Sequence, residues 1–252
     1  MPNRLMANGP APERRTAAQA GPDALVLAMD ASAGACSVAL LSGGATLGYL
    51  RRCMTHGHAA VLPPMIRQVI DEAGCRFSSL RIVAATVGPG SFTGVRVALA
   101  AARGIALAVG CPCIGVTSLE AIAAAAAHPG RLLVALDTRR GDVYGQVFDA
   151  GAAAGAPFVA DAATIAAQCG DPVAGIAGDG TSIVTEALAE SVERLPIFAP
   201  DAVAVGALAA RKWAARETGG RELSDRDWPA ALPLYLRAPE VSLPPPPVGA
   251  PS

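Results

Sequence analysis

A strand-turn-strand pattern that occurs twice limits the possible folds of this chain more than any other feature. The segment LVLAMD at 25–30 is apolar and ends in an acid, and the short turn ASAG leads to a second apolar run, ACSVALL. Two apolar runs joined by a short turn predict a β-hairpin. The same order returns 107 positions later in LLVALDTRRGDVYGQVFDAGA at 132–152. The matching residues are Leu25, Ala28, Asp30, Gly34, Gly44 and Ala45 in the first copy and Leu132, Ala135, Asp137, Gly141, Gly151 and Ala152 in the second. Although chance matches between apolar hairpins are common, internal duplication is favoured.

The rest of the chain alternates strand and helix patterns, as expected for an α/β fold. Strands are predicted at 81–87 and 112–116, and helices at 56–74, 91–109, 118–127, 163–170 and 201–216, the last with Asp201 as its N-cap. The segment 173–190 predicts a strand, a GDG turn and a helix. Pro63 and Pro64 fall inside the first helix. A proline there costs about 3 kcal/mol, so a kinked or late first turn is expected.

Duplicated hairpins predict two similar lobes that face one another across a cleft. We expect the first lobe at 24–117 plus about 201–217 and the second at 118–200, with disordered extensions at 1–23 and 239–252. Each lobe would direct an acid-bearing turn, at Asp30 or Asp137, towards the cleft where such folds bind ligands.

Charge and cysteine usage exclude several classes of protein. A formal net charge of −1 over 252 residues gives no basic surface for nucleic acid or for an anionic membrane, so any RNA would be held by another protein. The six cysteines form no CxxC pair, and no secretory leader is recognisable, which favours reduced thiols in a cytoplasmic protein. The apolar runs fall short of about 18 uninterrupted residues, so no membrane-spanning helix is expected.

The glycine-rich stretch VGPGSFTGVR at 87–96 lies between a predicted strand and a predicted helix, where a phosphate-binding loop would lie. It is not a P-loop, because Val95 stands where that motif needs a lysine. A dinucleotide fold would need an acid at the end of the next strand, and 112–116 has none. The remaining alternatives are a tight turn capped by Ser91 or Thr93 and an occasional anion contact at the helix N-terminus.

The helix predicted at 91–109 is apolar on nearly every side, with Arg96, Ala100, Arg103 and Leu107 on one stripe. Such a helix is either part of the core or part of an interface. Its sequence favours neither alternative.

Few residues of this chain could carry chemistry. His56 and His58 have no third ligand nearby, and His128 falls in a predicted loop. The four acids that could hold Mg²⁺ through water in a cleft, or could instead each cap a turn, are Asp30, Asp137, Asp142 and Asp179.

Several motifs together resemble the TsaB family, also called YeaZ. They are AMDASAGACSVAL at 28–40, HxxxxxP at His58–Pro64, GPGSFTGVR at 88–96, GVTSLEAIA at 115–123, ALDTRRGDVYGQVF at 135–148 and PLYLRAP at 233–239. The resemblance extends over about 24–240. It implies a two-lobed actin-like, Hsp70-like fold and a non-catalytic role in making N6-threonylcarbamoyladenosine in tRNA. The implied partners are the transferase subunit TsaD and the ATPase TsaE, with a homodimer when the chain is alone and tRNA contact only through the complex.

The resemblance also assigns residues. The partner interface would comprise His58, Met65, Val69, Arg96, Leu99, Ala100, Arg103 and Leu107. The catalytic relative carries a metal-binding pair of histidines where this chain has Ser118 and Ile122, which implies no metal site and argues against a metalloprotease. No cofactor is expected, with ATP or ADP only at the assembled interface.

The alternative is an active ATPase or transferase of the same fold. Its phosphate or nucleotide contacts would come from Asp30, Gly88, Gly90, Ser91, Thr93, Gly94, Asp137, Gly178 and Gly180.

Overall fold

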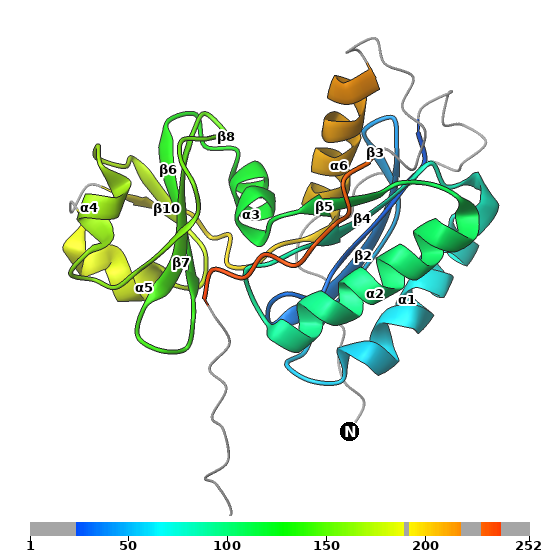
Figure 1. The fold of residues 1–252 in the computed structure, drawn as a ribbon, viewed down its shortest axis with the longest axis horizontal. Helices are drawn as coiled ribbons and strands as arrows, with labels where there is room; N and C mark the ends of the chain where they lie inside the picture. Colours follow the sequence, from blue (N-terminus) through cyan, green and yellow to red (C-terminus); the bar gives the residue numbers. More distant parts are fainter. Residues whose placement is uncertain (1–23, 189–191, 218–227, 238–252) are drawn as a thin grey trace, which may run out of the picture.

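Two β-sheets, one from each half of the chain, form the frame of the molecule (Figure 1). The computed structural model describes residues 24–188, 192–217 and 228–237, and the predicted extensions at 1–23 and 239–252 lie outside these ranges.

The first sheet has five strands in the order β3-β2-β1-β4-β5. They are β1 (Val26–Asp30), β2 (Ala35–Ser42), β3 (Ala45–Cys53), β4 (Ile82–Thr86) and β5 (Cys113–Val116). The first three strands are antiparallel, whereas β4 runs parallel to β1 and β5 parallel to β4. Every residue of β1 is buried, because helices cover both faces of the sheet.

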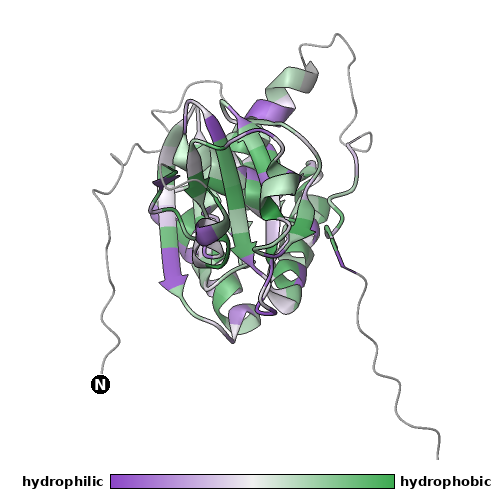
Figure 2. Cartoon of the chain, turned by 90° about the vertical axis from the view of Figure 1, so that its left-hand side faces the viewer, coloured by the Kyte–Doolittle hydropathy of each residue, from purple (hydrophilic) through white to green (hydrophobic). Residues whose placement is uncertain are grey.

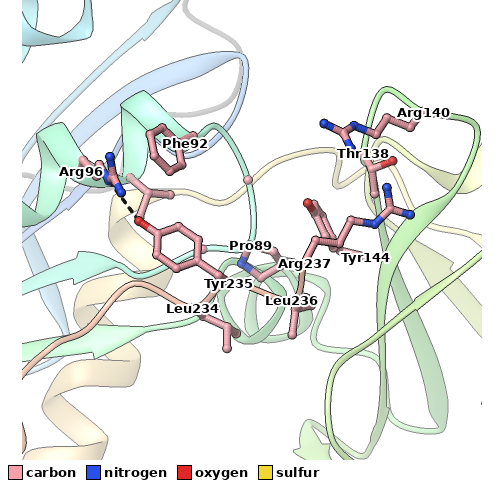
Figure 3. A pocket seen from close by; sticks show the side chains of 13 residues that line it. Pro89, Phe92, Arg96, Thr138, Arg140, Tyr144, Leu234, Tyr235, Leu236 and Arg237 are labelled. Atoms are coloured by element: carbon pink, nitrogen blue, oxygen red, sulfur yellow. Dashed lines mark hydrogen bonds between the residues drawn. The ribbon is translucent and has the colours of Figure 1, made fainter. Parts of the chain in front are cut away.

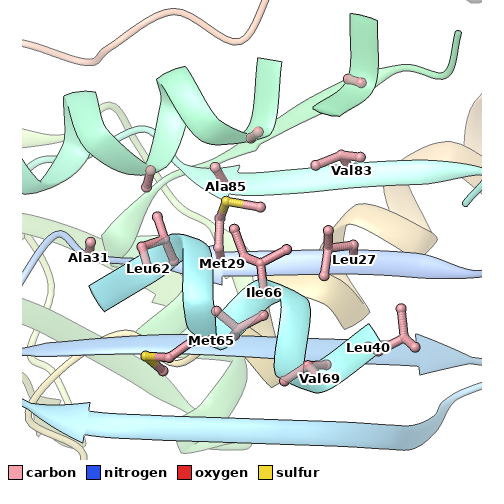
Figure 4. Packing of buried hydrophobic residues seen from close by; sticks show 14 of the residues in the cluster. Leu27, Met29, Ala31, Leu40, Leu62, Met65, Ile66, Val69, Val83 and Ala85 are labelled. Carbon is pink, nitrogen blue, oxygen red and sulfur yellow. The ribbon is translucent and has the colours of Figure 1, made fainter. Parts of the chain in front are cut away.

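The alternation along β1 shows which helix covers which face. Leu27 and Met29 pack with α1 (His58–Glu72) and α2 (Phe92–Val109), as Figure 4 shows for α1. Val26 and Ala28 point the other way and pack with α6 (Ala202–Glu217). Successive side chains of a strand face opposite sides of a sheet, so one apolar run supplies two cores.

The second sheet repeats this plan in the order β11-β10-β6-β7-β8, with β9 also paired to β7. Its strands are β6 (Arg131–Asp137), β7 (Val143–Asp149), β8 (Ala152–Ala153), β9 (Phe158–Ala160), β10 (Gly175–Ala177) and β11 (Glu193–Arg194). β6 and β7 form the predicted second hairpin, and β10 is parallel to β6 as β4 is to β1. The predicted two-lobed α/β architecture, with one hairpin in each lobe, is therefore confirmed.

Helices cover both faces of the second sheet as well. α4 (Ile165–Cys169) and α5 (Thr181–Val184) pack on one face, and α3 (Ser118–Ala126) packs on the other. α3 also contacts α6, so these two helices lie between the sheets (Figure 1). Figure 2 shows that the strands in the middle of the molecule are hydrophobic over most of their length.

Several local features differ from the sequence predictions, and the short strands β9 and β11 are among those not predicted. β3 was not predicted; its second half is exposed, and this edge strand carries no continuous apolar run. α1 runs through both prolines, which lie on its exposed side, so the carbonyl groups that lose their partners are on that side too. The helix after the GDG turn is shorter than predicted, with one α-helical turn followed by the 3-10 helix Thr185–Ala187.

Candidate functional site

The glycine-rich stretch forms the turn between β4 and α2, at the edge of the cleft between the lobes. Ser91 caps α2, because its side chain accepts a hydrogen bond from the Gly94 N–H at 3.2 Å. The Ser91 N–H donates to the carbonyl oxygen of Ser32, at 2.7 Å. A Cβ atom at Gly90 or Gly94 would overlap the backbone of Ser32 or Ala31. The glycines thus allow the loop to pack on the β1–β2 turn. The N–H groups of Ser91 and Gly94 both donate within the protein, so they are not available to a phosphate.

A pocket of about 390 Å³ opens beside this loop (Figure 3). Its lining comes from both lobes and from the C-terminal segment: Gly88, Pro89, Gly90, Phe92, Val95, Arg96, Thr138, Arg140, Tyr144, Leu234, Tyr235, Leu236 and Arg237. Of the predicted nucleotide-contacting residues only Gly88 and Gly90 line it. The other seven (Asp30, Ser91, Thr93, Gly94, Asp137, Gly178 and Gly180) do not.

Asp30 does not face this pocket, contrary to the prediction that its turn directs the acid into the cleft. It is fully buried, and its Oδ1 accepts hydrogen bonds from the hydroxyls of Ser32 and Thr86, both at 2.6 Å. Its Oδ2 has no hydrogen-bond partner in the part of the chain that the structure describes. Burial raises the pKa of the Asp30 carboxyl to about 6, despite these hydroxyl donors. A carboxyl group held in this way cannot contact a nucleotide without rearrangement.

The equivalent acid of the second lobe, Asp137, is engaged by an arginine. Arg139 donates from its backbone N–H and from its guanidinium to Asp137, at 2.6 and 2.8 Å. The same guanidinium reaches Asp179 at 2.9 Å, so it bridges two of the four acids predicted as cation ligands. Burial raises the pKa of Asp179. Among the residues that the structure describes, no group of three His, Cys, Asp or Glu side chains could hold a metal ion.

Gly178 and Gly180 repeat in the second lobe what Gly90 and Gly94 do in the first. A Cβ atom at Gly178 would overlap the Ala135 carbonyl oxygen, and the Gly180 N–H donates to that oxygen at 3.0 Å. Close backbone packing is again the reason for the glycines.

Ser118 and Ile122 occupy the positions where the resemblance places metal ligands in a catalytic relative. Both are fully buried. The Ser118 hydroxyl donates to Ser32 Oγ at 3.0 Å, and Ile122 belongs to the apolar core between α3 and the second sheet. Ser118 thus links the two lobes and Ile122 packs inside the second lobe, and an isoleucine has no donor atom for a metal.

Four residues predicted for the partner interface are buried in this chain, which corrects that assignment. Met65, Val69 and Leu99 are at most 2% exposed and belong to the core between α1, α2 and the sheet (Figure 4). His58 begins α1 and is 6% exposed, and burial, followed by the effect of His56, lowers its pKa. All four stabilise the first lobe rather than presenting a surface.

The other four, Arg96, Ala100, Arg103 and Leu107, lie on the exposed side of α2, and Leu107 is 86% exposed. Of the helices that the structure describes, α2 is the one long and apolar enough to cross a membrane, with a mean hydropathy of 1.5 over 18 residues, 33% of them buried. That criterion uses length and composition alone, and core helices also meet it.

The C-terminal segment contributes residues that the sequence did not assign to the site. The Arg96 guanidinium lies 3.5 Å from the centre of the Phe92 ring, and its Nε donates to Tyr235 Oη at 3.0 Å (Figure 3). Arg237 forms an ion pair with Asp142. The PLYLRAP motif was the available signal, but a motif does not reveal which distant residues it contacts.

Comparison with known proteins identifies the family. The chain is 36% identical over 122 residues to the tRNA threonylcarbamoyladenosine biosynthesis protein TsaB of Escherichia coli, a match covering 47% of this chain and 52% of that protein. YeaZ from Pseudomonas aeruginosa is 31% identical, with a TM-score of 0.69 over 84% of this chain and 100% of that chain. This chain belongs to the TsaB/YeaZ family.

Two further matches extend this result. Residues 48–168 match the family model of TsaD, described as tRNA N6-adenosine threonylcarbamoyltransferase. An uncharacterized protein of Mycobacterium bovis, Mb3455c, is 32% identical over 185 residues, which cover 73% of this chain and 76% of that protein. The chain spans about half the length of the TsaB proteins from Escherichia coli and Haemophilus influenzae, 52% and 51% respectively. Similarity to both TsaB and TsaD agrees with a fold shared by the two families.

Proposed function

We propose that this chain is a non-catalytic subunit in the synthesis of N6-threonylcarbamoyladenosine in tRNA. It pairs with a TsaD-type transferase subunit and a TsaE-type ATPase in the cytoplasm, without membrane contact. It reaches tRNA only through that complex, because a net charge of −1 gives little electrostatic attraction to the phosphates of RNA. The proposal is supported by the TsaB relatives of Escherichia coli and Haemophilus influenzae, which are tRNA threonylcarbamoyladenosine biosynthesis proteins.

The observation that carries the non-catalytic assignment is the state of the acids that the sequence predicted for the cleft. A phosphoryl-transfer site needs carboxylates that can hold Mg²⁺ directly or through water. Here Arg139 bridges Asp137 and Asp179, and Asp30 is buried against two hydroxyls. A cation would have to displace the Arg139 guanidinium and hydrate a carboxyl group that no solvent reaches.

The exposed side of α2 supports the pairing. This side of the helix exposes small and apolar residues to solvent: Ala100, Gly104, Leu107 and Ala108. Small residues let a second helix approach closely, and an exposed leucine beside them adds apolar area to bury. We assign this side of α2 to the transferase subunit and, when the chain is alone, to a second copy of itself.

The alternative, an active nucleotide-processing enzyme, is favoured by one feature. The pocket beside the glycine loop is lined by Arg96, Arg140 and Arg237, side chains that could bind phosphate. An ATP or ADP site at the assembled interface would also use such residues.

Reconstitution of tRNA modification from purified TsaD-type and TsaE-type subunits, with and without this chain, tests the proposal. We expect modification to require the chain, and we expect the chain alone to hydrolyse no MgATP above the blank. Stoichiometric bound metal in the purified chain would contradict the proposal. So would hydrolysis by the chain alone that is lost in Asp137→Ala but kept in Asp171→Ala, a change at an exposed acid outside the cleft.

A further inference from the structure

The last described segment of the chain crosses from one lobe to the other. This segment begins at Trp228. The centre of the Trp228 ring lies 5.7 Å from the centre of the Trp213 ring on α6. From there it passes along the glycine loop and ends at the second lobe, as the orange-red trace in Figure 1 shows. We call residues 231–237 the clasp.

The first half of the clasp is fixed to the first lobe by buried and directional contacts. Ala231 is 5% exposed within the core of that lobe, and its carbonyl oxygen accepts a hydrogen bond from Arg103 on α2. The Leu234 N–H donates to the Val87 carbonyl oxygen at 2.7 Å, immediately before the glycine loop. Tyr235 accepts from Arg96, also on α2. Backbone and side-chain contacts together therefore hold the segment in one position.

The end of the clasp is fixed to the second lobe. Arg237 pairs with Asp142 in the turn between β6 and β7, and the two side chains are 32% and 18% exposed. Asp142 is itself part of that turn's hydrogen bonding, since it accepts from the Thr138 hydroxyl and its carbonyl oxygen accepts from the Thr138 N–H. Arg237 thus holds the same turn that places Arg139 between Asp137 and Asp179.

We propose that the clasp holds the two lobes in one relative orientation without a bridging ligand in the cleft. Two-lobed proteins that close around a ligand use contacts of that ligand with both lobes to set the closed orientation. In this chain the clasp makes such contacts, with Arg103, Val87 and Arg96 on one side and Asp142 on the other. Leu234–Arg237 also line the pocket, so the clasp forms one wall of the cleft.

Hydrogen–deuterium exchange on the isolated full chain tests this proposal in the variant Arg237→Gln. We expect exchange at least about ten-fold faster than in the wild type in two places, the peptide covering 231–236 and the turn 138–143, because opening at the clasp frees both lobes. Asp142→Asn should give the same pattern from the other side of the ion pair. The charge-reversed pair Arg237→Asp with Asp142→Arg should restore slow exchange.

Arg211→Gln, a change at an exposed arginine on α6, is the matched control and should leave both peptides unchanged. Wild-type exchange in both peptides of Arg237→Gln, or acceleration confined to 231–236, would overturn the proposal. So would slow exchange restored in Arg237→Gln by MgATP, because a ligand would then be the bridge. These readouts need no partner subunit, so their failure is separate from failure of the proposed function.

Discussion

The carboxyl group of Asp30 is buried with no positively charged partner among the described residues, and its protonation is therefore coupled to folding. Its pKa is about 6 in the folded chain against an ordinary value of 3.8, chiefly because of burial, with a smaller contribution from Asp201. The folded state binds more protons between these two values, so this contribution to stability is present below pH 3.8. It is lost as the pH rises through about 6.

We predict that Asp30→Asn removes this part of the pH dependence. The measured quantity is the difference in the free energy of unfolding, wild type minus variant. This difference should fall by on the order of 1–3 kcal/mol between about pH 4 and pH 7. Urea titrations at several pH values measure it, with Asp171→Asn, at an exposed acid, as the control. A difference that stays constant with pH would show that Asp30 does not titrate in this range.

Two glycines of α2 provide a matched test of the packing of the glycine loop. A Cβ atom at Gly94 would overlap the Ala31 carbonyl oxygen, whereas a Cβ atom at Gly104 would meet nothing within 4 Å. We expect Gly94→Ala to lower the free energy of unfolding by about 2–4 kcal/mol, and Gly104→Ala to raise it by about 0.5–1 kcal/mol because alanine favours helix. Urea unfolding measures both. Equal effects would mean that the loop does not pack on the β1–β2 turn.

Among single residues, those with local roles could be predicted from the sequence. Ser91 caps α2, and Asp201 caps α6 by accepting from the Val203 N–H at 2.9 Å. The engagement of Asp137 by Arg139 could not be predicted, because it depends on a left-handed backbone at Arg139 (φ 65°) and on Asp179 from a different strand end. Neither is encoded in the spacing of the acids.

At the scale of elements, α2 combines a core side with an exposed side that we assign to a partner. Ala98, Leu99 and Ala102 are buried, while Ala100 is exposed on the opposite side. We predict that Ala100→Glu weakens binding of the TsaD-type subunit, and formation of the homodimer, by at least about ten-fold, because a charge would lose its solvation in the contact. Titration calorimetry and sedimentation measure the two equilibria.

Ala125→Glu on the exposed side of α3 is the control for that substitution. Both variants should keep the stability of the wild type within about 0.5 kcal/mol, as exposed surface changes usually do. Unaltered pairing of Ala100→Glu would exclude this part of α2 from the interface.

Elements with strong periodicity were predicted and weakly patterned elements were not. The apolar runs at 25–30 and 132–137 gave β1 and β6 because both faces of these strands are buried. β3 is an edge strand with the sequence ATLGYLRRC, whose last residues are exposed, so no apolar pattern marks it. The sequence also did not show which side of α1 and α2 faces the core. Met65, Val69 and Leu99 were predicted for the partner interface, and they pack on the sheet instead.

At the scale of the whole molecule, the duplication could be predicted and the contacts between the lobes could not. The two sheets share one strand order, and the repeated hairpin pattern in the sequence indicated that repetition. The clasp depends on Arg237 meeting Asp142, 95 positions earlier, and on Leu234 meeting Val87. Pairs so far apart in sequence leave no periodic trace in either segment.

α3 and α6 form one of the contacts between the lobes, and Ala121 lies in it. It is fully buried in the cluster that includes Ala202 and Val205 of α6, while the Lys212 ammonium pairs with Glu120 at 3.0 Å beside it. We predict that Ala121→Leu forces α3 away from α6 and lowers the free energy of unfolding by about 1–3 kcal/mol, the usual effect of overpacking.

Ala125→Leu places the same side chain on the exposed side of the same helix and should change stability by no more than about 0.5 kcal/mol. Urea unfolding measures both variants, and hydrogen exchange of Ala121→Leu should additionally accelerate in the clasp, since α3 and the clasp hold the same two lobes. A stable Ala121→Leu variant with wild-type exchange would mean that the contact between α3 and α6 can hold a larger side chain. The orientation of the lobes would then depend on the clasp and the connecting strands alone.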